Sequence, residues 1–257
     1  TAIFLDLDGT LAPIMPRPSQ ANLRESTREI LSKLAANPKF SVGVITGRKL
    51  SEIECMVLLN NIIYAGNHGL ELKGPGFCYT HAKTKEFRRT LKEVASAVHG
   101  MGKVFPGSFV EDKEITLCFH FRLVDDKWTA ALRAEFVKRV TPWLNTEKII
   151  VTESMKALEV RPYLDWDKGR AVQWILMHED PESLPVYIGD DRTDEDAFTA
   201  LAERGITIKV GYDKNSAAKY FLEDVSEVER FLSFMTIMGA GREPPAEAEP
   251  AKLEASK

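Results

Sequence analysis

Short apolar runs alternate with helical apolar patterns through the first part of the chain. Runs at residues 2–7, 40–45 and 62–65 are rich in strand-forming side chains and predict three strands. Apolar side chains at helical spacing separate these runs: Leu23, Ile30, Leu31 and Leu34 in one segment, and Leu50, Ile53 and Val57 in the next. This strand–helix–strand order is typical of a parallel sheet with helices on both faces.

The pattern changes after residue 72, where Gly74-Pro75-Gly76 interrupts regular structure. A helical pattern at 87–98 is followed by strict alternation at 115–123, which predicts an antiparallel strand with one apolar and one polar face. A second helical pattern at 132–140 precedes two short strand-like runs at 148–152 and 157–160. We therefore predict that residues 73–159 form an inserted α+β domain, helix–strand–strand repeated, with an open-faced sheet.

The earlier alternation resumes after residue 160. Helical patterns at 171–176, 197–202 and 225–235 surround strand-like runs at 185–188 and 206–210. The predicted fold class is α/β: a Rossmann-like parallel-sheet core formed by residues 1–72 and 160–236, with the α+β insertion at 73–159. The composition then shifts to Ala, Glu, Pro and Lys, so residues 237–257 are predicted to be a flexible tail.

Composition narrows the class of protein. The 257 residues are 44% hydrophobic and 28% charged with a net charge of −4, which is ordinary for a globular protein and argues against a nucleic-acid partner. Cys55, Cys78 and Cys118 form no C-x-x-C pair, which argues against a disulfide framework or a zinc site and favours a reducing, cytoplasmic location. Without an apolar run of spanning length or a signal-peptide pattern, we expect no membrane association.

The clearest candidate for chemistry is the sequence Asp6-Leu7-Asp8-Gly9-Thr10, which ends the first predicted strand. In open α/β sheets, ligands bind outside the carboxyl ends of strands. Two carboxylates two residues apart can both reach such a crevice, where one attacks an electrophile and the other handles protons. The alternative is an Asx-type turn that ends the strand and has no chemical role.

Three further polar groups occur at predicted strand ends or helix starts. Thr46 follows the second strand and offers a hydroxyl to an anion. Lys168 begins a helix, where the helix dipole disfavours a cation unless an anion is bound beside it. The third group follows a buried strand and consists of the carboxylates of Asp190, Asp191 and Asp194. Like charges packed together repel one another unless a cation neutralises them, and Mg²⁺ is the cation that usually binds such oxygen ligands.

These four groups resemble the four motifs of the haloacid dehalogenase superfamily of phosphotransferases. The resemblance implies that Asp6 attacks phosphorus and becomes an aspartyl phosphate, and that Asp8 protonates the leaving group and later activates water. It assigns Thr46 and Lys168 to binding of the phosphoryl group. The insertion resembles the large α+β cap of the superfamily's second class, which closes over the active site and supplies specificity.

The same resemblance implies a Mg²⁺ cofactor and its ligands. In the superfamily the metal rests on the nucleophile, here Asp6, on the backbone carbonyl that matches Asp8, and on an acidic residue that matches Asp190. Asp191 or Asp194 is expected to support the site.

Six segments are similar to the trehalose-6-phosphate phosphatase family, in order over roughly residues 2–235. They are YAGNHG at 64–69, VEDK at 110–113, FHFR at 119–122, LEVRP at 158–162, WDKG at 166–169 and GDDRTDEDAF at 189–198. The resemblance implies that Glu111, Lys113, Arg122 and Glu159 of the cap hold sugar hydroxyls. The substrate-binding set expected near the phosphate is Gly47, Arg48, Asn67 and His68.

Several alternatives stay open at this point. The cap residues could be surface ion pairs, and His68 could simply order a turn. The substrate could be sucrose 6-phosphate or a mannosyl- or glucosyl-3-phosphoglycerate, and a phosphosugar mutase or a non-catalytic domain that regulates a synthase are further readings. We expect a monomer that acts on a small-molecule sugar phosphate, and association with a trehalose-6-phosphate synthase is a further expectation.

Overall fold

The computed structural model describes residues 1–154, 156–179, 181–241 and 254–255. The chain divides into two compact units. Residues Thr1–Tyr79 and Trp166–Lys257 belong to the core unit, and residues Thr80–Asp165 form the cap unit. Among the described helices, none combines the length and apolar character that crossing a bilayer requires.

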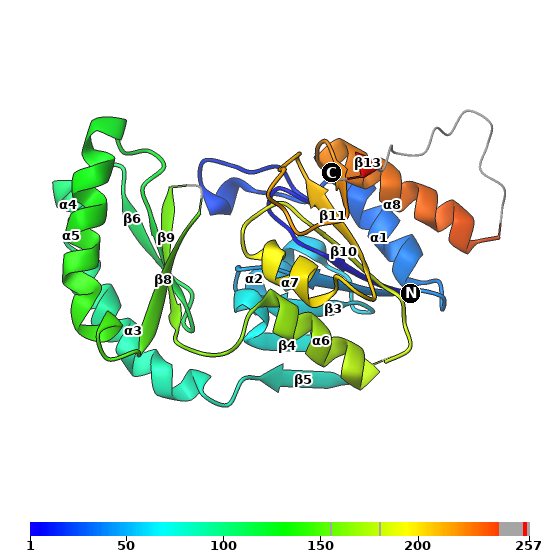
Figure 1. Ribbon diagram of the computed structural model, residues 1–257, viewed down its shortest axis with the longest axis horizontal. Helices are drawn as coiled ribbons and strands as arrows, with labels where there is room; N and C mark the ends of the chain where they lie inside the picture. Colours follow the sequence, from blue (N-terminus) through cyan, green and yellow to red (C-terminus); the bar gives the residue numbers. More distant parts are fainter. Residues whose placement is uncertain (155, 180, 242–253, 256–257) are drawn as a thin grey trace. The chain divides into compact units, whose positions relative to one another are not determined.

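A mixed sheet forms the centre of the core unit (Figure 1). In the described residues its strand order is β13-β12-β11-β10-β1-β2-β3-β4-β5. The strands are β1 (Ala2–Leu5), β2 (Ser41–Ile45), β3 (Ile63–Gly66), β4 (Glu71–Gly74), β5 (Phe77–Thr80), β10 (Pro185–Gly189), β11 (Ile206–Val210), β12 (Tyr220–Leu222) and β13 (Glu254–Ala255). Strands β12 through β3 in this order run parallel, and β4 and β13 pair antiparallel. The sequence predicts the parallel strands apart from β12, which it misses.

Alternate side chains of β1 enter two separate hydrophobic cores. Ile3 and Leu5 pack with apolar residues of α1, α2 and α8, whereas Ala2 and Phe4 pack with those of α6 and α7. The helices are α1 (Glu25–Ala35), α2 (Leu50–Val57), α6 (Lys168–Glu179), α7 (Asp194–Ala200) and α8 (Val225–Gly239), with short 3-10 helices η1 (Pro18–Gln20) and η2 (Asn67–Gly69). Burial on both faces explains why these strands have continuous apolar sequences.

An antiparallel sheet with the order β6-β7-β9-β8 forms the cap unit. Its strands are β6 (Phe109–Asp112), β7 (Leu117–His120), β8 (Ile149–Ser154) and β9 (Ala157–Pro162), and its helices are α3 (Thr84–Val98), α4 (Met101–Val104) and α5 (Asp126–Leu144). Leu117, Phe119, Leu158 and Val160 point to one face and pack against apolar residues of α3 and α5. The other face carries the polar side chains, which matches the predicted open-faced sheet.

The predicted strand at 115–123 is too long. β7 ends at His120, and the next residues turn, with the amide of Val124 donating to the carbonyl of Phe121 at 3.0 Å. The turn is required because Asp125 caps α5, its side chain accepting from the amide of Lys127. Arg122 therefore lies in this turn rather than on the polar face of the strand.

Both predicted domain borders also differ from the structure. The sequence places the borders after residues 72 and 159, whereas the units divide after Tyr79 and Asp165. β4 continues the core sheet by pairing with β3, so the chain leaves the core later than the Gly-Pro-Gly break suggests. The predicted tail begins within α8, which continues to Gly239, and residues 242–253 and 256–257 of that tail lie outside the described residues.

Candidate active site

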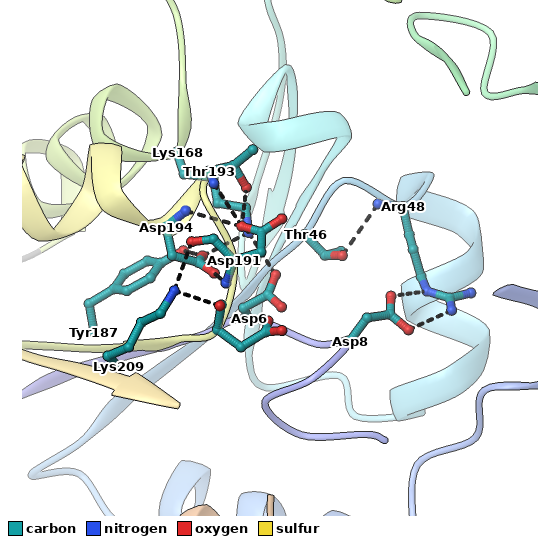
Figure 2. Close-up of polar contacts among 11 residues, drawn as sticks. Asp6, Asp8, Thr46, Arg48, Lys168, Tyr187, Asp191, Thr193, Asp194 and Lys209 are labelled. Carbon is teal, nitrogen blue, oxygen red and sulfur yellow. Dashed lines mark hydrogen bonds and ion pairs between the residues drawn. The ribbon is translucent and has the colours of Figure 1, made fainter. Parts of the chain in front are cut away.

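Polar side chains from several elements meet at the carboxyl edge of the core sheet (Figure 2). Asp6 directly follows β1, Thr46 follows β2 and Asp190 follows β10. Leu5 of β1 is in register with Val44 of β2 and with Ile188 of β10, so these three strand ends lie side by side. A parallel sheet must gather such residues at one edge, which is why strand ends predicted this site.

The Lys168 ammonium lies at the centre of the site. Lys168 is the first residue of α6, and its side chain is 1% exposed. Its Nζ donates to Asp6 Oδ1 at 2.7 Å and to Asp194 Oδ1 at 2.7 Å, with Asp191 Oδ1 at 3.8 Å. Burial lowers the pKa of Lys168, but Asp194 and Asp6 outweigh it and raise the pKa well above its ordinary value. Lys168 therefore presents a permanent positive charge.

Asp6 sits in a buried and crowded electrostatic environment. Burial is the largest effect and raises the pKa of Asp6 well above its ordinary value. The charge of Lys168 opposes this rise, while the carboxylates of Asp194 and Asp190 add to it. The single Lys168 ammonium thus does not offset the effect of burial on the pKa of Asp6, and a second cation beside it would lower that pKa.

Asp190 provides the best evidence that a metal fits here. Its Oδ1 is buried and has no hydrogen-bond partner, a costly arrangement that a bound cation would relieve. Carboxylate oxygens of Asp6, Asp190 and Asp194 lie within 4.8 Å of one another. Burial, followed by the charges of Asp194 and Asp191, raises the pKa of Asp190 to about 7. An all-oxygen set of this kind suits a hard divalent cation such as Mg²⁺.

Gly9 makes the approach of Asp190 feasible. Gly9 has φ +93°, and a Cβ atom built on it would lie 2.1 Å from Asp190 Oδ2. Any side chain at this position would therefore collide with the carboxylate and strain the backbone. The glycine in the Asp-Leu-Asp-Gly-Thr sequence is explained by this contact as well as by the turn.

Both carboxylate oxygens of Asp194, and Oδ1 of Asp191, accept hydrogen bonds from the protein. Asp194 Oδ1 accepts from the Tyr187 hydroxyl at 2.7 Å as well as from Lys168, and its Oδ2 accepts from the Asp191 amide at 2.9 Å. Asp191 Oδ1 accepts from the amide and hydroxyl of Thr193 at 2.8 and 2.7 Å. These bonds orient Lys168 and the loop after β10, and metal ligation by Asp191 and Asp194 stays a prediction.

Sequence reasoning missed two residues that support this loop. Lys209 of β11 is buried, and its Nζ donates to the carbonyls of Asp190 at 2.5 Å and Asp191 at 3.4 Å, with Glu195 at 3.6 Å. Tyr187 of β10 is fully buried and bonds Asp194. A lysine and a tyrosine inside apolar strand sequences were the available signals, since buried polar groups require partners.

Asp8 and Arg48 form an ion pair apart from the Lys168 group (Figure 2). Arg48 Nε and Nη2 donate to the two oxygens of Asp8 at 2.6 and 2.7 Å, and Nη2 also donates to the carbonyl of Pro18 at 2.9 Å. The Arg48 amide donates to Thr46 Oγ1 at 3.3 Å. The metal contribution expected of Asp8 comes from its backbone carbonyl and is compatible with this pair.

Asn67 and His68 shape the loop that carries Thr46. Both have left-handed backbone conformations, with φ of 50° and 58°. The Asn67 amide donates to the Arg48 carbonyl at 2.7 Å, and the His68 amide donates to the Thr46 carbonyl at 2.9 Å. The Asn67 side chain donates to the glutamate that begins β4, at 2.8 Å. A Cβ built on Gly47 would lie 2.7 Å from His68 Nε2, so the imidazole covers this loop. Substrate contact by these residues stays a prediction.

Two of the expected sugar-binding residues, Glu111 and Glu159, lie on the open face of the cap sheet, and Lys113 and Arg122 follow strands of the same sheet. Cys118 is in register with Glu111 on one side and with Glu159 on the other. Lys113 Nζ lies 3.5 Å from Glu159 Oε1. Burial lowers the pKa of Lys113, but the negative charge of Glu159 and of other nearby groups has the larger combined effect and raises this pKa overall. Burial raises the pKa of the Cys118 thiol to about 12, and Arg122 is close enough to act in the opposite direction. Glu111 and Glu159 therefore flank Cys118 in the sheet, whereas Lys113 follows β6 and Arg122 lies in the turn after β7. The charges of all four residues act on the Cys118 thiol.

Comparison with known proteins defines first the class and then the family. The fold is shared with a haloacid dehalogenase-like hydrolase from Bacteroides thetaiotaomicron, which is 16% identical with a TM-score of 0.60 over 91% of this chain and 98% of that one. A solved trehalose-6-phosphate phosphatase related protein is 25% identical, with a TM-score of 0.82 over 95% of this chain and 100% of that one.

The family follows from the sequence matches. The trehalose-phosphatase family model matches residues 4–226, and this chain therefore belongs to that family. Trehalose-phosphate phosphatase B of Arabidopsis thaliana is 38% identical over 248 residues, which cover 90% of this chain. The match spans 64% of the length of that relative.

Proposed function

We propose that this chain is a phosphoric monoester hydrolase that converts trehalose 6-phosphate to trehalose and phosphate. The observation that carries the proposal is the buried Lys168 ammonium between Asp6 and Asp194, beside the unsatisfied Oδ1 of Asp190. Phosphoryl transfer depends mainly on positioning and on neutralising the charge of the phosphoryl oxygens, which such a site supplies. Membership of the trehalose-phosphatase family supports the choice of sugar.

The first chemical step uses Asp6 as the nucleophile. One of its oxygens is held by Lys168, and the other attacks phosphorus. The bond between phosphorus and the sugar oxygen breaks, an aspartyl phosphate forms on Asp6, and the carboxyl group of Asp8 delivers a proton to the leaving oxygen. Both Asp8 oxygens accept N–H groups of Arg48, so at least one of these bonds must open before Asp8 faces the leaving group.

Water completes the reaction. Asp8 takes a proton from a water molecule while the water oxygen attacks phosphorus. The bond between phosphorus and the Asp6 oxygen breaks, which releases phosphate and restores the Asp6 carboxylate. General acid–base catalysis of this kind contributes about 10²–10⁴-fold to the rate, far less than the total acceleration that phosphate monoesters need. Alignment and charge neutralisation by Lys168 must therefore supply much of the remainder.

Asp6, Asp190 and the backbone carbonyl of Asp8 would hold Mg²⁺. When bound, this cation supplies positive charge to the phosphoryl oxygens and stabilises the ionised form of the nucleophile. The fit rests on the buried, unpartnered Oδ1 of Asp190 and on the raised pKa values of Asp6 and Asp190.

The cap residues would recognise the sugar. The carboxylates of Glu111 and Glu159 can accept hydrogen bonds from sugar hydroxyls, and Lys113 and Arg122 can donate to hydroxyl or ring oxygens. Glu111 and Glu159 flank Cys118 in the sheet register, and the charges of Lys113 and Arg122 act on the same thiol, which supports this assignment. A cytoplasmic location is the accompanying proposal, because the exposed free thiols of Cys55 and Cys78 suit a reducing compartment. The monomeric state stays an expectation. Association with a trehalose-6-phosphate synthase stays an expectation.

Phosphate release is the direct test. Trehalose 6-phosphate should release phosphate faster than sucrose 6-phosphate or a mannosyl- or glucosyl-3-phosphoglycerate, and a chelator should abolish the release. A preference for one of the other substrates would overturn the proposed sugar. An isomerised sugar phosphate without free phosphate would show a mutase, and no reaction with any substrate would show a non-catalytic domain.

Asp6→Asn tests the covalent route. We expect activity to be lost, because the amide lacks the second carboxylate oxygen that attacks phosphorus, while circular dichroism and thermal unfolding show an intact fold. Full activity in this variant would exclude an aspartyl phosphate.

A further inference from the structure

The open face of the cap sheet contains a hydrogen-bonded pair of which one member, His120, lies outside the expected sugar-binding set. His120 Nε2 lies 2.6 Å from Glu111 Oε2. The Phe109 ring stacks on the imidazole, with centroids 4.7 Å apart and an interplanar angle of 21°. The β6–β7 register explains this arrangement, since Phe109 is opposite His120 and Glu111 is opposite Cys118.

The imidazole is held on more than one side. The Phe109 ring covers its face, and Cys118 Sγ lies 3.9 Å from its Nδ1. The His120 and Glu111 side chains are only 13% and 21% exposed. A glutamate with one oxygen fixed in this way loses less conformational freedom when it binds a ligand, and such preorganisation strengthens binding.

A metal is a less suitable occupant of the same cluster. Ligand-type atoms of Glu111, Cys118 and His120 lie within 4.8 Å of one another, which resembles a zinc ligand set. However, the buried ammonium of Lys113 interacts electrostatically with both Glu111 and Cys118 and already supplies a cation there. The Cys118 thiol also has its pKa raised to about 12, so the thiolate that zinc needs is disfavoured.

We propose that His120, supported by the Phe109 ring, is a positioning residue for sugar recognition. Its Nε2–H donates to Glu111 and sets the direction of that carboxylate towards a sugar hydroxyl. The inference rests on the proposed function, in which Glu111 contacts the sugar. His120 itself need not touch the substrate or the reacting phosphate.

Two substitutions of His120 distinguish its hydrogen bond to Glu111 from the space that its side chain fills. The Gln side chain places its amide N–H about where His120 Nε2 lies, whereas the Asn amide is shorter and reaches only the place of Nδ1. We expect His120→Asn to raise KM for trehalose 6-phosphate about tenfold, because this variant loses one charge-assisted hydrogen bond to Glu111. The value of kcat should change little. His120→Gln should restore most of the affinity.

Para-nitrophenyl phosphate provides the internal control, because it has a phosphate but no sugar. Its KM and kcat should change less than about twofold in both variants. Equal effects on the two substrates, or an identical KM for trehalose 6-phosphate in all three proteins, would overturn the proposal. Thermal unfolding of each variant shows whether the cap remains folded.

A spectroscopic arm tests the pair independently of turnover. Long-range nitrogen–proton NMR of the histidine rings should show His120 protonated at Nε2, and its signal should shift in Glu111→Gln and on addition of trehalose. A His120 signal that moves in neither case would overturn the inference. If wild type releases no phosphate from trehalose 6-phosphate while the His120 signal still responds, only the proposed function fails.

Discussion

Replacing Asp190 with asparagine should stabilise the metal-free protein while abolishing its response to Mg²⁺. Burial is the main cause of the raised pKa of Asp190, and the charges of Asp194 and Asp191 add to it, whereas Lys168 and Lys209 oppose it. The rise from 3.8 to about 7 is about 3 units, and at 1.36 kcal/mol per unit this is about 4 kcal/mol. The metal-free protein therefore bears a considerable cost when Asp190 is ionised.

The sign of the pH dependence follows from the direction of the shift. The folded protein binds this proton more tightly than the unfolded chain, so the group contributes stability below about pH 4 that is lost as the pH rises through about 7. Asparagine cannot ionise, but its buried amide must find partners, at a cost of about 1–3 kcal/mol. We expect Asp190→Asn to be more stable than wild type by about 1–3 kcal/mol near pH 8.

Urea unfolding with a chelator present, near pH 5 and near pH 8, measures this difference. Mg²⁺ at about 100 times its dissociation constant should stabilise wild type by about 2.7 kcal/mol and leave Asp190→Asn unchanged. A metal-free variant that is less stable than wild type near pH 8 would contradict the cost assigned to ionised Asp190. An equal Mg²⁺ gain in both proteins would remove Asp190 from the metal site.

Two other substitutions test how the side chains around the site are positioned. Arg48→Met should lower kcat for trehalose 6-phosphate about tenfold, because Asp8 loses the donor that still orients its carboxyl group after one of the two bonds has opened. Arg48→Lys should not restore kcat, since an ammonium lacks the planar, two-pronged geometry that orients this carboxyl group, and full restoration would contradict the role of Arg48. Lys209→Met should weaken Mg²⁺ binding about 10–100-fold in a calorimetric titration, because the carbonyl of Asp190 loses its donor. Lys219→Met is the matched control, since Lys219 donates to the Gly205 carbonyl instead, and equal effects of the two would argue against the role of Lys209.

Hydrophobic periodicity was enough to predict most of the fold. Runs of apolar residues identified every described parallel strand except β12, because both faces of this sheet are buried by helices. Periodicity could not show where the cap strand ends, because Phe121 remains buried after the chain has left β7. It also could not assign β4 to the core, since that assignment depends on its pairing with β3.

The sequence by itself determined that Asp6, Thr46 and Asp190 would lie at one edge, because the carboxyl ends of parallel neighbouring strands must meet there. Only the tertiary structure decided which charges contact one another. Asp8 pairs with Arg48, and His120 pairs with Glu111, through distances that depend on strand register and rotamer. The order of residues along a chain specifies which side chains approach a site, whereas the choice of partner depends on packing in three dimensions.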